Sequence, residues 1–598
     1  MKFKVKSVMA FMLSAILLLT VGCAQKVDIG FKNSLPKDSD VSYINEITED
    51  MITDISDGIN SENMQVDPNN DSDNTSNDFS EGGGNSFGSD SETLRFKYPL
   101  SLGMTNDVSP TFRWTEVSNA TYKLNVQEYS ENKWKTVIDV SGLTGTSYKN
   151  GSVMKSGGIY RAIVTAVTTN GEIQCIEAVN DGLLFMNYID PKTHPANDGI
   201  DYTFKNKISE KVLNNYLDRA VTCELLNRSD DGFSLEEQGR NRIRAILNMG
   251  VKYVSRTYGS FKVSADTLSL SNTSLVKQLI DEAHDIDPQI IFEAGIFETV
   301  SESVDKIPIP DWVFKAFGRT PENRNFSYEK MLFPDGKGVN QHGSGLHTPD
   351  ITQLETQMHF YHLACTYIDL GFEAFHMGQT ALVGANDKDY ECYSKLFSMI
   401  RSYAKQNARR GMVLINSHNS TVPMKNASGV FLIDFLAEPA AIYDIAGTAH
   451  LPSENNPQKA EIRSNSGVWT RKYSGVTPSG WYATNLPCYA EFDNWMSVPE
   501  SNNALMNPTG RVDVPWGMDE ISWFANQPAS YRHSFIDYIY KKAKSFNENA
   551  HICFPISRPI YSIKKSEMTY YYAASSVFSS SGFDDEEVIK ATYIRGRG

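Results

Sequence analysis

Residues 487–495 read Pro-Cys-Tyr-Ala-Glu-Phe-Asp-Asn-Trp, and residues 516–524 read Trp-Gly-Met-Asp-Glu-Ile-Ser-Trp-Phe. The first piece alternates like a strand, because successive side chains of a strand point to opposite faces. One face of the strand holds the apolar residues Cys488, Ala490 and Phe492, and the other holds Tyr489, Glu491 and Asp493. If the apolar face packs against helices, the two carboxylates and the phenol point toward the interior that the strand helps to enclose.

Similar apolar runs recur through the last 400 or so residues of the chain and alternate with helical patterns. Eight such runs are the number that a (β/α)8 barrel requires. The sequence therefore predicts an α/β fold, a TIM-type barrel over residues 195–598. The runs are Ala220 to Leu226, Val251 to Thr257, Gln289 to Ile296, Phe372 to Gly378, Met412 to His418, Val430 to Phe435, Cys488 to Asp493 and His551 to Ile556.

The alternation within these runs predicts a polar site. If the apolar residues face the helices, a set of ionisable and amide side chains points inward near the carboxyl ends of the strands, where active sites of such barrels lie. Buried charges are costly unless they are paired or used, so the structural alternative is a set of satisfied buried ion pairs. The inward set comprises Glu224, Glu293, His376, Asn416, His418, Asp434, Glu491 and Asp493.

Tryptophan residues stand close in sequence to the seventh strand. Trp495 follows it directly, and Trp523 lies in the next segment. Carboxylates beside aromatic rings are typical of glycosyl chemistry, in which acids transfer protons or attack and rings stack on sugar faces.

At this point the chain resembles the glycoside-hydrolase-like barrels of secreted bacterial proteins, over roughly residues 195–598. Because like charges in a partly dry site keep one carboxyl protonated, we expect Glu293 to be the proton donor, with Asp434 in reserve. The resemblance implies a glycosidase with Glu491, on the seventh strand, as nucleophile or base. It departs from those families at the fourth strand, which ends in His376 and Gln379 instead of the usual acid. A non-catalytic glycan-binding protein is therefore the alternative. The expected substrate-binding residues are Glu224, His376, Gln379, His418, Asp493, Trp495 and Trp523.

Residues 1–22 read as a signal peptide, with three lysines followed by an apolar run from Val8 to Val21. The next residues, Gly22-Cys23, resemble a bacterial lipoprotein signal, which implies lipidation of Cys23 and anchoring at the extracellular face of the cell membrane. An ordinary secretory signal is the alternative.

Residues 23–94 are rich in Asp, Glu, Asn, Ser and Gly, and we expect a disordered acidic tether. Much of the formal net charge of −16 lies there. Nucleic-acid partners need basic patches, so this charge argues against them. The expected partners are a carbohydrate and, through the anchor, a membrane.

Residues 95–187 contain short alternating runs separated by Gly, Ser, Asn and Pro, which predict a small β-sandwich. The order of Pro110, Trp114, the Tyr122 run, the Gly142 turn and the Tyr160 run resembles fibronectin type III domains. That resemblance implies a spacer or adhesion module.

No motif in the sequence calls for a cofactor or a metal ion. There is no His-Glu-x-x-His, no phosphate-binding Gly loop and no nucleophile elbow at a strand-to-helix turn. His376, His418 and Asp434 could still bind a cation. Cys223, Cys488 and Cys553 fall in predicted buried strands, so we expect inert core thiols and few or no disulfides.

Overall fold

The computed structural model describes residues 93–105, 107–187, 199–229, 233–418, 424–445, 450–494, 518–579 and 582–596. The predicted signal peptide, Cys23, the tether up to residue 92 and Trp495 lie outside the described residues. In the ranges described, no helix is both long and apolar enough to cross a membrane.

Two small sheets precede the barrel and share a core around Phe112, Trp114 and Tyr122. Their pairings are antiparallel except for that of β2 with β9. The resemblance to fibronectin type III domains stays a prediction. One sheet comprises β1 (Phe96–Tyr98), β3 (Thr111–Trp114) and β6 (Ser147–Lys149), and the other comprises β2 (Met104–Thr105), β9 (Leu183–Asn187), β7 (Ile159–Thr168), β4 (Thr121–Ser130), β5 (Lys133–Leu143) and β8 (Gly171–Gln174).

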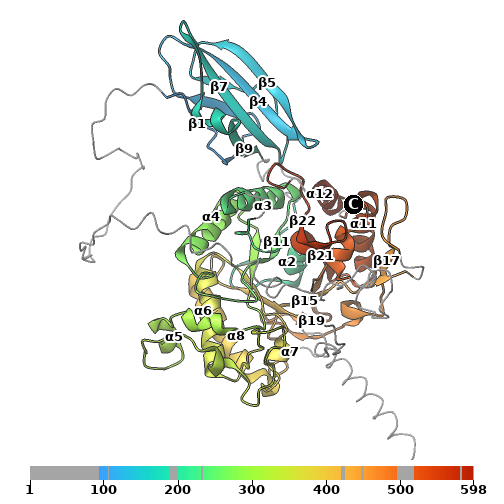
Figure 1. Cartoon of the computed structure of the whole chain (residues 1–598). Coiled ribbons are helices and arrows are strands. Elements are labelled where there is room, and N and C mark those ends of the chain that lie inside the picture. The colour runs from blue at the N-terminus through green and yellow to red at the C-terminus, as the bar shows by residue number, and fades with distance from the viewer. Residues whose placement is uncertain are drawn as a thin grey trace, which may run out of the picture. The chain divides into compact units, whose positions relative to one another are not determined.

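The remainder of the chain forms a closed barrel of eight parallel strands (Figure 1), which confirms the predicted fold class. The last strand pairs with the first, so the sheet has no free edge within the barrel. A hairpin strand, β22 (Glu567–Tyr572), runs antiparallel to the end of the last strand. The barrel strands are β10 (Ala220–Cys223), β11 (Tyr253–Tyr258), β12 (Ile291–Gly295), β13 (Ala374–His376), β14 (Leu414–Ser417), β15 (Phe435–Pro439), β20 (Cys488–Glu491) and β21 (Ala550–Ser562).

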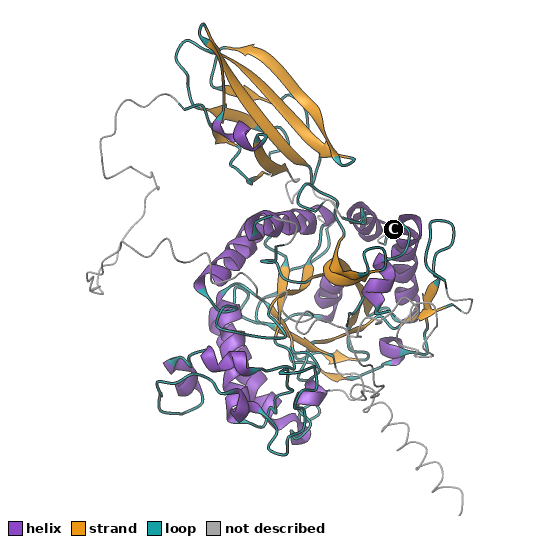
Figure 2. Ribbon diagram, in the orientation of Figure 1, coloured by secondary structure: helices purple, strands orange, loops and turns teal. Residues whose placement is uncertain are grey.

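Helices surround the strands (Figure 2), as burial of both faces of a parallel sheet requires. Helix α3 (Leu235–Met249) shows how the sequence sets helix ends. Ser234 and Glu237 form a reciprocal cap at its start, and Gly250 ends it in a left-handed conformation. The main helices are α2 (Glu210–Leu217), α3 (Leu235–Met249), α4 (Leu270–Ile286), α6 (Leu354–Asp369), α8 (Glu391–Asn407), α10 (Glu520–Ala525), α11 (Ala529–Phe546) and α12 (Glu586–Arg595).

The apolar residues divide between the inside and the outside of the barrel largely as the alternation predicts. Val221, Phe292 and Phe375 belong to the large core that includes the helices. A separate core contains Ile291 and Tyr489 together with residues of α2. The barrel is therefore filled by side chains at the amino ends of its strands, and the polar groups lie above this plug.

Candidate active site

Glu293 lies at the centre of the polar group, on β12, and has no exposed surface. The Tyr253 hydroxyl and the Asn416 amide each donate to one of its oxygens at 2.5 Å. The backbone N–H of Arg256 donates to the other oxygen at 3.2 Å. Burial raises the pKa of Glu293 to about 7, although these hydrogen bonds and the charge of Arg256 oppose the rise. The carboxyl group can therefore hold a proton near neutral pH.

Glu491 lies on β20, equally buried, in a different environment. The guanidinium groups of Arg256 and Arg558 both donate to it, the second at 3.0 Å, and His418 Nε2 lies 3.2 Å from the same carboxylate. Burial alone would raise the pKa of Glu491, but the two arginines and His418 lower it well below the usual range. Glu491 is therefore an anion at neutral pH.

Arg256 contacts both carboxylates because its strand is irregular. Between Val254 and Tyr258 the pairing of β11 with β12 shifts, and Arg256 has a left-handed φ of 58°. A non-glycine residue in this region costs about 1–3 kcal/mol and persists only where its surroundings impose it. Here the bulge turns the guanidinium toward Glu491 while the backbone N–H of the same residue faces Glu293.

Arg558 gathers the acids on the other side of Glu491. Its guanidinium lies 3.4 Å from Glu224 and 3.5 Å from Asp493, and it donates to Asn494 at 2.7 Å. The Glu224 side chain is 29% exposed, whereas that of Asp493 is 2% exposed. Glu224 is thus more exposed than Asp493, and more than His418, whose side chain is 15% exposed.

The predicted polar residues of β13 and β14 join the same cluster. His376 Nδ1 donates to the side-chain amide oxygen Oδ1 of Asn416 at 2.7 Å. The centres of the His376 and His418 imidazole rings lie 4.7 Å apart. Burial holds the pKa of His376 well below its usual value. For His418, burial acts in the same direction, but the hydrogen bond to Glu491 and the charges of Asp493 and Glu491 together outweigh it, and the pKa is raised.

Gln379 lies just after β13 and binds a carboxylate that the alternation did not predict. Its side-chain amide and its backbone N–H donate to Glu298 at 2.8 and 3.2 Å. This pair joins the segments that follow β12 and β13.

The predicted inward position of Asp434 is wrong. Its carboxylate accepts hydrogen bonds from Arg401 on α8 at 3.0 Å and from the Ile415 backbone at 2.9 Å. The sixth strand starts at Phe435, whose ring belongs to the core inside the barrel, so the preceding residue faces the helices. The structure therefore places Asp434 away from the two glutamates.

Trp523 also differs from expectation. It is fully buried in α10, donates from Nε1 to the Gln458 carbonyl at 3.2 Å, and packs edge-on against Phe535 at 4.9 Å. Such a ring supports the fold and offers no face to a sugar.

We expect Trp523→Ala to destabilise the protein by about 3–5 kcal/mol, the usual cost of truncating a buried tryptophan. Urea unfolding of this variant and of Trp523→Phe measures the effect, and the Phe variant should lose less because it keeps most of the packing. A loss of glycan affinity without any loss of stability would contradict the buried role.

Two arginines central to the cluster, Arg256 and Arg558, were missed by the sequence-based reasoning. Strict alternation would turn Arg256 outward, since Tyr253 points inward. For Arg558 the predicted run ends at Ile556, two residues too early. The pairing of β21 with β10 passes from Pro555 to Ser557 and skips Ile556, which reverses the faces at this point. No local pattern in the sequence reveals either shift.

Metal and disulfide chemistry receive no support from the described residues. In the ranges given above, no three His, Cys, Asp or Glu side chains gather to hold a metal ion. The six cysteines of those ranges are free, and five of them are buried, as expected of core thiols.

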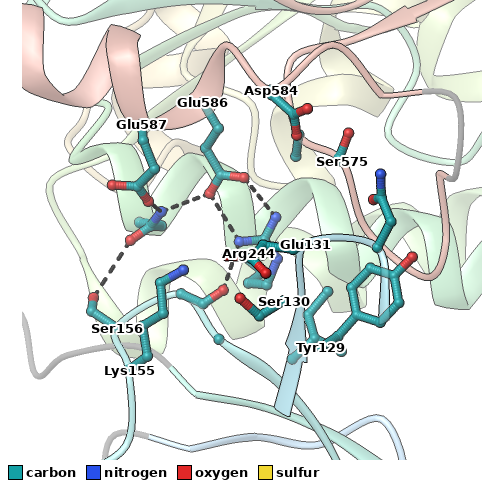
Figure 3. Close-up of a pocket in the computed structure, with 16 residues that line it drawn as sticks. Tyr129, Ser130, Glu131, Lys155, Ser156, Arg244, Ser575, Asp584, Glu586 and Glu587 are labelled. Carbon is teal, nitrogen blue, oxygen red and sulfur yellow. Dashed lines mark hydrogen bonds and ion pairs between the residues drawn. The ribbon is translucent and has the colours of Figure 1, made fainter. Parts of the chain in front are cut away.

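A polar pocket whose lining does not include Glu293 or Glu491 is shown in Figure 3. Its lining includes Lys155, Arg244 on α3, and Glu586 and Glu587 on α12. Arg244 donates to both oxygens of Glu586 at 2.9 and 2.8 Å and to the Gly157 carbonyl at 2.8 Å. Arg244 and Glu586 thus form a buried ion pair in the wall of this pocket.

No protein-family model matches this chain, and no curated protein matches it. Among solved structures, it is similar to an FMN-binding beta-glucuronidase from Facaelibacterium prausnitzii L2-6, with 10% identity and a TM-score of 0.31, over 84% of this chain and 61% of that one. It is also similar to a beta-glucuronidase from Parabacteroides merdae, with 10% identity and a TM-score of 0.27, over 77% and 46%.

A third solved structure, the type III pullulan hydrolase from Thermococcus kodakarensis, is similar with 10% identity and a TM-score of 0.23, over 57% of this chain and 64% of that one. The chain thus spans less than two thirds of each of these proteins. At such values the similarity does not indicate what this chain acts on.

Proposed function

We propose that the barrel is a carbohydrate-active enzyme, a glycosidase that uses Glu293 and Glu491 as its paired carboxylates. The observation that supports this most directly is the contrast between their environments. Burial raises the pKa of Glu293 to about 7, whereas two arginines and His418 overcome the effect of burial at Glu491 and hold it ionised. Two acids with separated pKa values are how one site supplies both a proton donor and an anion.

In this mechanism Glu293 transfers its proton to the glycosidic oxygen as the bond from that oxygen to the anomeric carbon breaks. Glu491 then either bonds to the anomeric carbon or removes a proton from the attacking water. Arg256 positions both carboxyl groups, because its side chain binds Glu491 and its backbone N–H donates to Glu293. His376 and His418 supply further hydrogen-bonding groups for sugar hydroxyls.

A non-catalytic glycan-binding protein is the second candidate, and one observation favours it. Neither glutamate has exposed surface, and the Glu491 carboxylate already contacts the side chains of Arg256, Arg558 and His418. A saturated buried cluster of this kind also serves as a purely structural support.

Turnover separates the two candidates. Purified protein is incubated with 4-nitrophenyl glycosides and with soluble starch, xylan and mixed-linkage β-glucan, and reducing ends and nitrophenol are followed. A glycosidase releases product from at least one substrate; retention on a polysaccharide without any release of product identifies the binding protein.

We also propose that Cys23 anchors the protein to the extracellular face of the membrane, on the basis of the sequence that precedes it. Cys23→Ala should abolish incorporation of a radiolabelled fatty acid and move the protein from the membrane to the soluble fraction, since one signal for attachment is lost. Cys175→Ala, which changes a buried thiol elsewhere, is the matched control. Unchanged processing and membrane association of the Cys23 variant would refute the anchor.

A further inference from the structure

Two phenylalanines stack at the carboxyl ends of β11 and β12, beside the glutamate cluster. The rings of Phe261 and Phe297 lie 4.4 Å apart at an angle of 18°. Phe261 is 44% exposed, and Phe297 is half-buried beneath it. The exposed ring of Phe261 follows the carboxyl end of β11, the end of such a barrel at which active sites lie, so a ligand at that end can contact it.

The backbone is built to hold this pair. Gly259 has a φ of 102°, and a Cβ atom there would lie 2.2 Å from the Gly295 carbonyl oxygen. At Gly295 itself a Cβ atom would lie 2.5 Å from the Phe297 ring. The Thr299 hydroxyl donates to the Phe261 carbonyl oxygen. Two glycines therefore permit the close approach of the segments that carry the rings, and a hydrogen bond fixes it.

The lower ring reaches the charged cluster. Phe297 lies 6.0 Å from the His376 ring, and the Arg256 guanidinium lies 6.0 Å from the Phe297 ring centre. Arg256 in turn binds Glu491. Arg256 thus links the aromatic pair to Glu491, the proposed nucleophile or base.

We infer that Phe261 and Phe297 form the sugar-binding platform of this site, on which the apolar C–H face of a pyranose ring stacks against Phe261. This inference rests on the proposed function and adds the residues that hold the substrate. The platform replaces the role that the sequence suggested for Trp523. Because a planar ring accepts any pyranose with an exposed apolar face, the platform provides affinity, and the polar cluster selects the sugar.

Phe261→Ala tests the inference. Affinity electrophoresis in gels that contain soluble starch, xylan or mixed-linkage β-glucan measures binding, and hydrolysis of the same polysaccharides gives KM and kcat. We expect affinity to fall, and KM to rise, by about tenfold, equivalent to 1.4 kcal/mol, while kcat changes by less than about threefold. Phe261→Trp should restore binding because it keeps a ring.

Tyr482→Ala is the matched control, since this 62% exposed ring lies on β19 (Tyr482–Ala483), outside the barrel. The two possible failures are distinguishable. If the parent protein binds and cleaves a polysaccharide but Phe261→Ala does so with unchanged KM, the platform is wrong and the glycosidase stands. If the parent neither binds nor cleaves any of the three and releases no nitrophenol from the 4-nitrophenyl glycosides, both proposals fall.

Discussion

Glu491→Gln is expected to lower turnover of a glycan substrate by several orders of magnitude. The amide can neither attack the anomeric carbon nor accept a proton from water, and it leaves Arg256 and Arg558 without the anion that both contact. Initial rates on the substrate found in the screen measure the effect. If the variant kept activity within about tenfold of the parent, which corresponds to about 1.4 kcal/mol of barrier, Glu491 would not be a catalytic residue.

The same substitution also removes the carboxylate partner of the buried Arg256 guanidinium and one of the partners of Arg558, and breaking a buried ion pair typically costs a protein about 3–5 kcal/mol. Glu491→Asp is the control, because it keeps the negative charge and withdraws it by one methylene group. We expect this variant to unfold near the parent temperature and still to lose most activity. Loss of activity in Glu491→Gln alone, with near-parental rates in Glu491→Asp, would indicate a structural role.

Glu293→Gln is expected to lower kcat/KM by about 10²–10⁴-fold, the usual contribution of a positioned proton donor. The loss should be largest for natural glycans, whose leaving oxygen needs the proton, and smallest for 4-nitrophenyl glycosides, whose leaving group departs as an anion. Comparison of both substrate types on one preparation measures this difference.

The pH profile gives a second readout for Glu293. A donor works only while protonated, so the activity of the parent should fall as pH rises through about 7, the pKa to which burial raises this carboxyl. Glu293→Gln should show a low rate without that alkaline limb. An identical limb in the variant and the parent would assign the titration to another group, such as His418, whose pKa is also raised.

Alternation of apolar and polar residues was sufficient to predict the barrel and much of the site. It predicted Glu293 and Glu491 on inward faces because β12 and β20 are short, regular strands with one apolar side. The same reasoning failed at Asp434, because apolar residues flank it on both sides and the strand begins only at Phe435. Hydrophobicity alone does not show where a strand begins.

The arginines show a second limit of the sequence. Arg256 and Arg558 reach the cluster through shifts in strand pairing, and such a shift turns every later side chain to the opposite face. The shift at Arg256 depends on contacts with Glu491 and Glu293, both far away in sequence. Local propensity carries no record of partners hundreds of residues apart, so the charge state of Glu491 required the structure.

The strand that closes the barrel, β21, has a consequence for synthesis of the protein. Residues 550–562 pair with both β10 and β20, so those two strands keep open edges until this segment has been made. Exposed edges of apolar parallel strands pair readily with other chains, and domains that close late are exposed to aggregation for longer. A chain that ends before Ala550 therefore holds an unclosed sheet, and chaperone binding during translation should be greatest for chains of that length.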